Sequence, residues 1–240
     1  MRNFRLTIEY DGTGFHGWQV QPGLRTVQGE LYSAFEEISK GPLKVTGAGR
    51  TDAGVHAAGQ VASVLADTSL SPGRVLRAVR HKLPRDIFLR EVDEAPIEFN
   101  ARFDARDRTY HYIFIGRRTA LWRRFYLPVP ADLDIGAMRE AVSALRGEHD
   151  FSSFTTAKAA KGGALCRVIR ADLIDTPPLL TISLTADRFV HNMVRAIAGT
   201  VLEAGKGAGI DMEQVLAARE RRAAGPTVPP HALYLMKVTY

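Results

Sequence analysis

The segment Gly47–Ala57, GAGRTDAGVHA, holds the residues whose types and spacing could do chemistry. Arg50 and Asp52 stand two positions apart among glycines and alanines, which bury little surface. Glycine lets a backbone approach a ligand closely, so a carboxylate here could serve as a nucleophile or a base. Such a carboxylate, once buried, needs a cation beside it that lowers its pKa and keeps it ionised. The plainer interpretation is an exposed salt bridge between Arg50 and Asp52, which would contribute little.

A second glycine-rich segment, GTGFHG at 12–17, matches the G-x-G-x-x-G pattern of dinucleotide-binding proteins and follows a predicted strand. That site also needs a helix to begin there, so that its N-terminus can hold the pyrophosphate. The residues that follow include Pro22 and Gly23, which are poor in the first turns of a helix. We therefore expect a tight loop whose Trp18 packs on the core, and no nicotinamide or flavin.

The histidines and the cysteine argue against metal and triad chemistry. Seven histidines are scattered, and no pair has the spacing of a helical zinc motif. Cys166 is the only cysteine, which excludes an intrachain disulfide and a cysteine-based metal site and favours a reducing cytoplasm. No G-x-S-x-G nucleophile elbow is present. We expect no metal and no cofactor.

Basic residues gather in three places in a chain of net charge +6. One cluster lies on a predicted helix, one alternates along an extended segment before Tyr110 and Tyr112, and one flanks a Gly-Gly pair: Arg74, Arg77, Arg80, His81 and Lys82; Arg102, Arg106 and Arg108; Lys158, Lys161 and Arg167. Each alone could be a solvated face. Three clusters beside aromatic rings favour nucleic acid, because arginine and lysine neutralise phosphates and rings stack on bases.

The elements that must position these residues alternate between strand and helix patterns. Period-two segments predict strands at 4–10, 43–49, 59–66, 86–92, 109–115, 165–175, 179–187 and 231–240. Amphipathic segments predict helices at 26–40, 71–84, 134–147 and 189–205, with a short one after Asp211. Several neighbouring strands look antiparallel, so the class is α+β. We place the seam between an N-terminal half, 1–100, and a C-terminal half, 101–240.

The chain start, MRNFRLTIEY, alternates apolar and polar residues, so we expect no signal peptide. No apolar run is long enough to cross a membrane.

At GAGRTDAGVHA the sequence closely resembles the tRNA pseudouridine synthase A family. The segments YDGTGFHGWQVQ, ARFDARDRTYHY, GEHDFSSF, FVHNMVRAIAG and PPHALYLMKVTY also resemble blocks of that family, in the same order, over nearly the whole chain. The resemblance implies two α/β halves whose antiparallel sheets join into one extended sheet, with a basic RNA-binding cleft between them. It implies a cytoplasmic homodimer that isomerises uridine on the 3′ side of the anticodon stem-loop of tRNA, without cofactor or metal.

The resemblance also assigns roles to residues. Asp52 matches the catalytic aspartate, and Arg50 matches the arginine that helps to displace the target base. Tyr110 matches the tyrosine that stacks on the flipped uracil and is a candidate for proton removal at C5. Arg195 matches the basic partner of the aspartate, and Leu233 matches the apolar residue below the base.

Three alternatives stay open at this point. The first is a related uridine isomerase that acts on a different RNA. The second is a non-catalytic tRNA chaperone, against which the set Arg50, Asp52, Tyr110 and Arg195 argues. The third is a nucleotide-dependent oxidoreductase.

Overall fold

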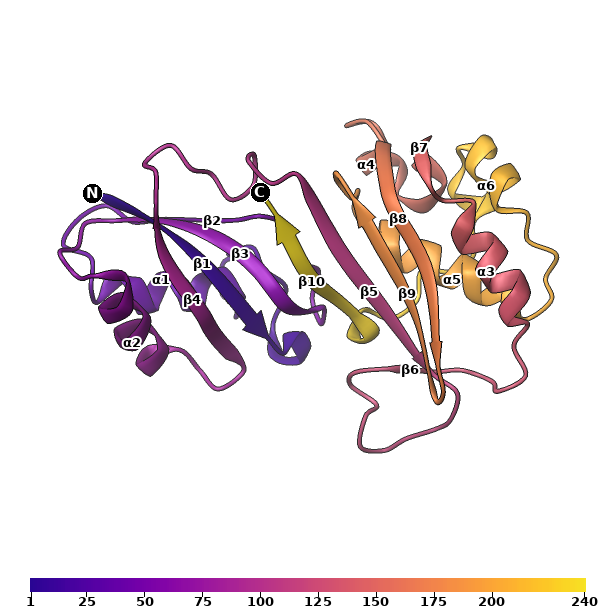
Figure 1. The fold of residues 1–240 in the computed structure, drawn as a ribbon, viewed down its shortest axis with the longest axis horizontal. Helices are drawn as coiled ribbons and strands as arrows, with labels where there is room; N and C mark the ends of the chain where they lie inside the picture. Colours follow the sequence, from indigo (N-terminus) through magenta and orange to yellow (C-terminus); the bar gives the residue numbers. More distant parts are fainter. The chain divides into compact units, whose positions relative to one another are not determined.

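The computed structural model describes residues 1–240 and divides into two compact units. Unit 1 contains Met1–Arg106 together with the last strand, Tyr234–Tyr240, and unit 2 contains Asp107–Leu233. The sequence-based division keeps the last strand in the C-terminal half. The contacts group it with unit 1 instead, because its first residues pair with the start of a unit 1 strand. Figure 1 colours this strand yellow and labels it β10.

Unit 1 is built on a sheet in the order β4-β1-β3-β10, with β2 paired to β3. All of these pairings are antiparallel except that of β10 with β3. The strands are β1 (Arg2–Tyr10), β2 (Lys44–Gly47), β3 (His56–Ala66), β4 (Ile87–Ala95) and β10 (Leu233–Thr239). Its helices are α1 (Val27–Glu36) and α2 (Pro72–Lys82).

The two helices of unit 1 begin near the predicted residues, but only one has a side-chain cap. Thr26 precedes α1, and its hydroxyl accepts a hydrogen bond from the backbone N–H of Gly29, as an N-cap residue does. Ser71 precedes α2 but makes no such bond, so Pro72 at the first helical position marks the start. The apolar faces of both helices are buried, at Val27, Leu31, Ala34 and Phe35 in α1 and at Val75 and Val79 in α2.

Unit 2 has an antiparallel sheet in the order β5-β9-β8-β7, with β6 paired in parallel to β5. The strands are β5 (Asp107–Ile115), β6 (Leu127–Pro128), β7 (Gly147–Asp150), β8 (Leu165–Thr176) and β9 (Leu179–Ala186). The helices are α3 (Ile135–Ser143), α4 (Ala157–Ala160), α5 (Met193–Gly205) and α6 (Met212–Ala218). Helix α3 packs on both α5 and β8.

Two predicted helix boundaries in unit 2 are wrong. The helix expected at 189–205 begins only at Met193, because Asn192 has a left-handed backbone with φ of 64°, which ends the helical hydrogen-bond pattern. The helix expected to stop at Gly147 ends at Ser143. Gly147 is instead the first residue of β7. Its φ of 113° lies in a region of backbone conformation that favours glycine.

The predicted class is confirmed, because helices are combined with sheets that are mostly antiparallel. None of the helices combines the length and the apolar character that crossing a membrane requires.

Candidate active site

The loop of residues 48–55 joins β2 to β3 and carries Arg50 and Asp52. Its first residue is tied to the middle of β3, because β2 and β3 are antiparallel neighbours and the N–H of Ala48 donates to the carbonyl of Val61 at 2.8 Å. A turn follows Asp52, whose carbonyl accepts from the N–H of Val55 at 3.1 Å. Gly54 within the turn has φ of 79°, in the region that favours glycine. The side chain of Asp52 is half-buried at this turn.

Buried polar side chains hold the loop on both sides of Arg50. The hydroxyls of Tyr10 and Thr51 share a hydrogen bond of 2.8 Å, and the amide of Gln60 donates to the carbonyl of Gly49 at 2.9 Å. All three side chains are more than nine-tenths buried. Burial raises the pKa of Tyr10 to about 12, so its hydroxyl stays protonated at neutral pH. These hydrogen bonds fix the backbone on which Asp52 sits.

Glycines of the preceding loop let the chain pass against this one. A Cβ on Gly12 would lie 2.0 Å from the carbonyl oxygen of Val55, and one on Gly17 would lie 2.7 Å from that of Thr51. A Cβ on Gly47 would lie 2.4 Å from the ring of Trp18, which is 1 % exposed. The prediction that Trp18 packs in the core is confirmed.

The same packing explains GTGFHG without a nucleotide. A 3-10 turn, Gly12–Gly14, follows β1, and no α-helix begins before Val27. The helix N-terminus that a pyrophosphate site needs is therefore not at this place. The glycines serve the packing of one loop on another.

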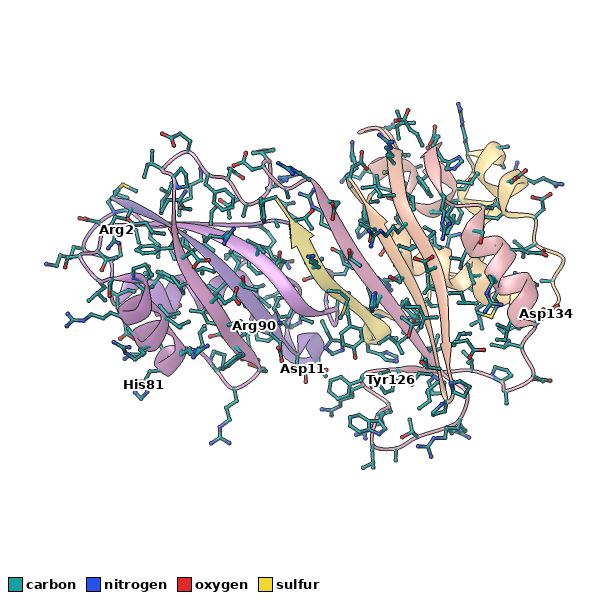
Figure 2. The ribbon with its side chains drawn as sticks, in the orientation of Figure 1. Arg2, Asp11, His81, Arg90, Tyr126 and Asp134 are labelled. Carbon is teal, nitrogen blue, oxygen red and sulfur yellow. The ribbon has the colours of Figure 1, made fainter.

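His56, the first residue of β3, anchors the end of the loop. Its Nδ1 accepts a hydrogen bond from the N–H of Gly12 at 3.0 Å and lies 3.2 Å from a carboxylate oxygen of Asp11, which Figure 2 labels. Its ring stacks on that of Tyr234 with centroids 4.8 Å apart. The imidazole thus ties together the end of β1, the start of β3 and the start of β10.

The loop salt bridge that the plainer interpretation requires is not formed. Arg50 is exposed and makes no ion pair with Asp52, although they are two positions apart. The guanidinium therefore extends toward solvent, where a ligand can reach it.

Unit 2 carries the other three predicted site residues. Tyr110 lies on β5 and is 7 % exposed. Its ring meets that of Phe189 edge to face, with centroids 5.0 Å apart and planes at 79°. Phe189 fixes the orientation of the tyrosine ring from the segment just before α5. Leu233, the last residue of unit 2, is buried and begins β10.

Arg195, in the first turn of α5, holds the segment that leads to β10. Its Nε donates to the carbonyl of Val228 at 2.8 Å, and its Nη1 donates to the side-chain oxygen of Asn192 at 3.0 Å. The hydroxyl of Tyr112 donates to the next carbonyl, that of Pro229, at 2.8 Å. Burial raises the pKa of Tyr112 well above its ordinary value, so it remains a donor.

Sequence reasoning missed the residues that support the site. Tyr10, Thr51, Gln60 and Tyr112 carry no local signal of their role, because each bonds to a residue far along the chain or to a backbone carbonyl. The only available hint was a polar Gln60 inside an apolar strand, since a buried amide needs partners.

Part of the basic cluster on α2 is structural. Arg80 donates to the carbonyl of Leu89 at 2.6 Å, and its guanidinium lies 4.6 Å from the centre of the Phe88 ring. It joins α2 to β4. Arg74 and Arg77 on the same helix are exposed.

The chain has two α/β units with mostly antiparallel sheets and an Arg-x-Asp loop that buried hydrogen bonds hold in place. Comparison with known proteins assigns a chain of this kind to one family. The profile of the family described as tRNA pseudouridine synthase matches residues 6–104 and 141–240. These two segments cover more than half of the chain, in both units. The chain belongs to the tRNA pseudouridine synthase family, and it is an isomerase whose substrate is tRNA.

Curated relatives named tRNA pseudouridine synthase A match over the full length. That of Caldicellulosiruptor bescii is 39% identical, and the alignment covers 100% of both chains. Those of Geobacillus sp. strain WCH70 and Geobacter sp. strain M21 are each 42% identical, over 100% of this chain and 98% and 99% of theirs. A solved structure of an unknown protein from Galdieria sulphuraria aligns with 88% of this chain and 95% of its own, at 11% identity and a TM-score of 0.23, which carries no argument.

Proposed function

We propose that this isomerase converts uridine to pseudouridine on the 3′ side of the anticodon stem-loop of tRNA, with Asp52 as the nucleophile. The target base is first flipped out of its stack, and Arg50 occupies the space that it leaves. Tyr110 stacks on the uracil, Leu233 packs below it, and Arg195 is the basic partner of Asp52. These roles rest on the family resemblance of the motifs.

The observation that carries the proposal is the support of the Asp52 loop. The hydroxyl of Thr51 is hydrogen-bonded to that of Tyr10, and the carbonyl of Gly49 accepts a hydrogen bond from the side chain of Gln60. The residues on both sides of Arg50 are therefore fixed. Asp52 itself is half-buried at a turn where small neighbours leave room for a nucleoside. A nucleophile placed on a rigid backbone loses little freedom when the substrate binds, which favours reaction.

The chemistry needs an anion and a proton acceptor but no redox partner. The bond from ribose C1′ to N1 breaks, a bond from C1′ to C5 forms, N1 gains a proton and C5 loses one. Asp52 adds either to C6 of the uracil or to C1′ of the ribose, and both routes remain open. Each requires an ionised carboxylate. Extruding the base costs a few kcal/mol, which Arg50 offsets by bonding phosphate or neighbouring bases.

The test is release of tritium from unmodified tRNA labelled at uridine C5, with the product position mapped. The wild type releases tritium and places pseudouridine in the anticodon stem-loop. Asp52→Asn releases none, because the amide is no nucleophile, but still binds tRNA. Turnover in Asp52→Asn would refute the nucleophile, and product elsewhere would favour the runner-up, a uridine isomerase for another RNA.

The matched control is Asp134→Asn. Asp134 caps α3 by accepting from the N–H of Ala137 at 2.9 Å, and asparagine caps a helix as well as aspartate does. The chemical change equals that at Asp52, yet the rate should stay at the wild-type value. Figure 2 labels Asp134 at the start of this helix.

We further propose that the enzyme is a cytoplasmic homodimer in which one tRNA touches both subunits. The single, buried cysteine suits a reducing compartment. Sedimentation of the free protein measures the oligomeric state, and the mass of a monomer at micromolar concentration would contradict the dimer.

A further inference from the structure

The connection between β5 and β6 is a loop of unusual composition. Residues 116–126, here named the arginine loop, read GRRTALWRRFY and contain four arginines and no acidic residue. The loop leaves the end of β5 and returns as β6, which pairs with β5 at Phe114 and Leu127. Its ends are thus close together, as in an Ω-loop, a type of surface loop that often carries function. Figure 1 shows the loop below the label β6.

The arginine loop exposes apolar and cationic side chains together. Leu121 is 82% exposed and Trp122 is 47% exposed. Arg117, Arg118 and Arg123 are exposed and form no ion pair. A large exposed indole among uncompensated positive charges is typical of a binding surface.

The backbone of the loop forms a defined turn at Trp122. The N–H groups of Phe125 and Tyr126 both donate to the carbonyl of Trp122, at 2.9 and 3.1 Å. The rings of Trp122 and Tyr126 lie 6.1 Å apart. Figure 2 labels Tyr126 in this loop. A partner of Trp122 therefore meets a ring that is already oriented, so less freedom is lost on binding.

The family profile does not cover this loop, because its matched segments end at residue 104 and resume at residue 141, although the curated relatives align across it. None of the residues proposed for the reaction belongs to it. Two partners could cover the loop, a second copy of this chain or an RNA, and the charge of the loop favours RNA. A two-fold contact of the loop with itself would bring arginines against arginines, whereas the phosphates of RNA complement them.

We propose that the arginine loop is a second tRNA-binding site, distinct from the uridine pocket. Arg117, Arg118 and Arg123 contact backbone phosphates, and Trp122 stacks on an unpaired base. Stacking on aromatic rings and neutralisation of phosphates are the two contacts by which proteins bind unpaired nucleotides. That the polyanion is tRNA rests on the proposed function.

Tryptophan fluorescence gives the first test, because the chain has two tryptophans and Trp18 is buried. Acrylamide quenches the emission of Trp122 in the free protein. Saturation with unmodified tRNA should protect it, and in Trp122→Phe the tRNA-dependent change should vanish. Quenching that is the same with and without tRNA would overturn the proposal.

Variants give the second test, by filter binding of unmodified tRNA at several salt concentrations. Trp122→Ala should raise Kd about tenfold, while Trp122→Phe, which keeps a ring, should raise it less. The double variant Arg117→Gln/Arg118→Gln should reduce the slope of log K against log salt by about 1.5, since each lost phosphate contact removes about 0.7 to 0.9.

The matched control removes two positive charges elsewhere, in Arg5→Gln/Arg222→Gln. Both arginines are exposed and are paired with carboxylates, Asp93 and Glu220. This variant has the same net charge as the loop variant and should leave the salt slope nearly unchanged. Equal slopes in the two double variants would overturn the proposal, because the loop would then act through net charge alone.

Two further outcomes are distinguishable. If Trp122→Ala lowers the sedimenting mass and tRNA binding together, the loop is a subunit contact and the proposal fails. Binding and quenching need no turnover, whereas the proposed function is tested by tritium release from the wild type. A wild type that protects Trp122 but releases no tritium would remove the proposed function and support the binding loop.

Discussion

At the scale of single residues, Asp52 depends on neighbours that never need to touch the substrate. The hydroxyls of Tyr10 and Thr51 are bonded to each other inside the protein, next to the carboxylate-bearing residue. A buried hydroxyl that loses its partner costs about 1 to 3 kcal/mol, so the pair is needed for the loop to keep one conformation. The conformation of the site residue Asp52 therefore depends on hydrogen bonds between buried residues of the core.

Tyr10→Phe tests this support. The variant keeps the ring but leaves the Thr51 hydroxyl without its partner, so the free energy of unfolding should fall by about 1 to 2 kcal/mol and tritium release should slow. Urea unfolding at pH 8 and single-turnover kinetics measure the two effects. Wild-type stability and rate together would show that the hydrogen bond is dispensable.

The raised pKa of Tyr10 also predicts how the stability of the protein depends on pH. The pKa of Tyr10 is about 12 in the folded protein, against about 10 when unfolded, so the unfolded chain loses this proton first as pH rises. The stability that this group contributes is therefore lost as the pH rises from about 10 toward about 12. Unfolding curves from pH 8 to 11 should fall less steeply for Tyr10→Phe; parallel curves would contradict the assignment.

Tyr110→Phe separates stacking from proton transfer. The phenyl ring keeps its contact with Phe189, so tRNA affinity should change little. If the hydroxyl takes part in removing the C5 proton, tritium release should slow by about a hundredfold or more. Tyr32→Phe, a change at a half-buried tyrosine in α1, is the control and should retain the rate. A normal rate in Tyr110→Phe would show that water, and not the tyrosine hydroxyl, removes the C5 proton.

At the scale of elements, α5 and the segment before β10 act as one part. Helix α5 packs closely against the segment before β10 only because residue 199 is glycine: a Cβ there would lie 1.8 Å from the carbonyl oxygen of Pro226. Arg195 on the same helix donates to the carbonyl of Val228. The helix thus positions its arginine and the approach to Leu233 together.

Gly199→Ala should separate these elements. The added methyl meets a backbone oxygen, so we expect a loss of about 1 to 3 kcal/mol in the free energy of unfolding, together with lower activity. Gly73→Ala in α2 is the matched control, because no atom lies within 4 Å of its Cβ, and it should stabilise by a few tenths to about 1 kcal/mol. Thermal unfolding of both variants measures the difference; equal shifts would contradict the close contact.

Element patterns in the sequence predicted much of this scale, since alternation and caps are local signals. The strand pair broken by TPP appears as β8 and β9, and Asp211 caps α6 through its carboxylate. The start of α5 was missed by several residues. Asn192 adopts its left-handed conformation in the fold, and most asparagines do not adopt it, so composition alone gave no warning.

At the scale of the whole molecule, charge is the property that reaches furthest. The net charge is +6, and exposed arginines occur in both units, among them Arg50 and Arg117. A polyanion that binds such a surface releases counterions, so its affinity depends on salt.

The affinity of the wild type for unmodified tRNA should therefore fall at least tenfold between about 50 and 200 mM salt. Filter binding at fixed pH measures this dependence, with Asp52→Asn as a check that turnover does not contribute. An affinity that does not change with salt would mean that phosphates contribute little, and the basic surfaces would need another explanation.

The sequence by itself determined the family, the class of reaction, the mixed α/β composition and the residues that merit mutation. These conclusions depend on motifs and local periodicity, which are written in neighbouring residues. Only the tertiary structure decided that Arg50 and Asp52 do not pair, that glycines 12 and 17 serve loop packing, and that Tyr10 and Gln60 hold the Asp52 loop. Those facts arise from contacts between segments far apart along the chain, and a buried hydrogen bond has no local pattern by which to predict it.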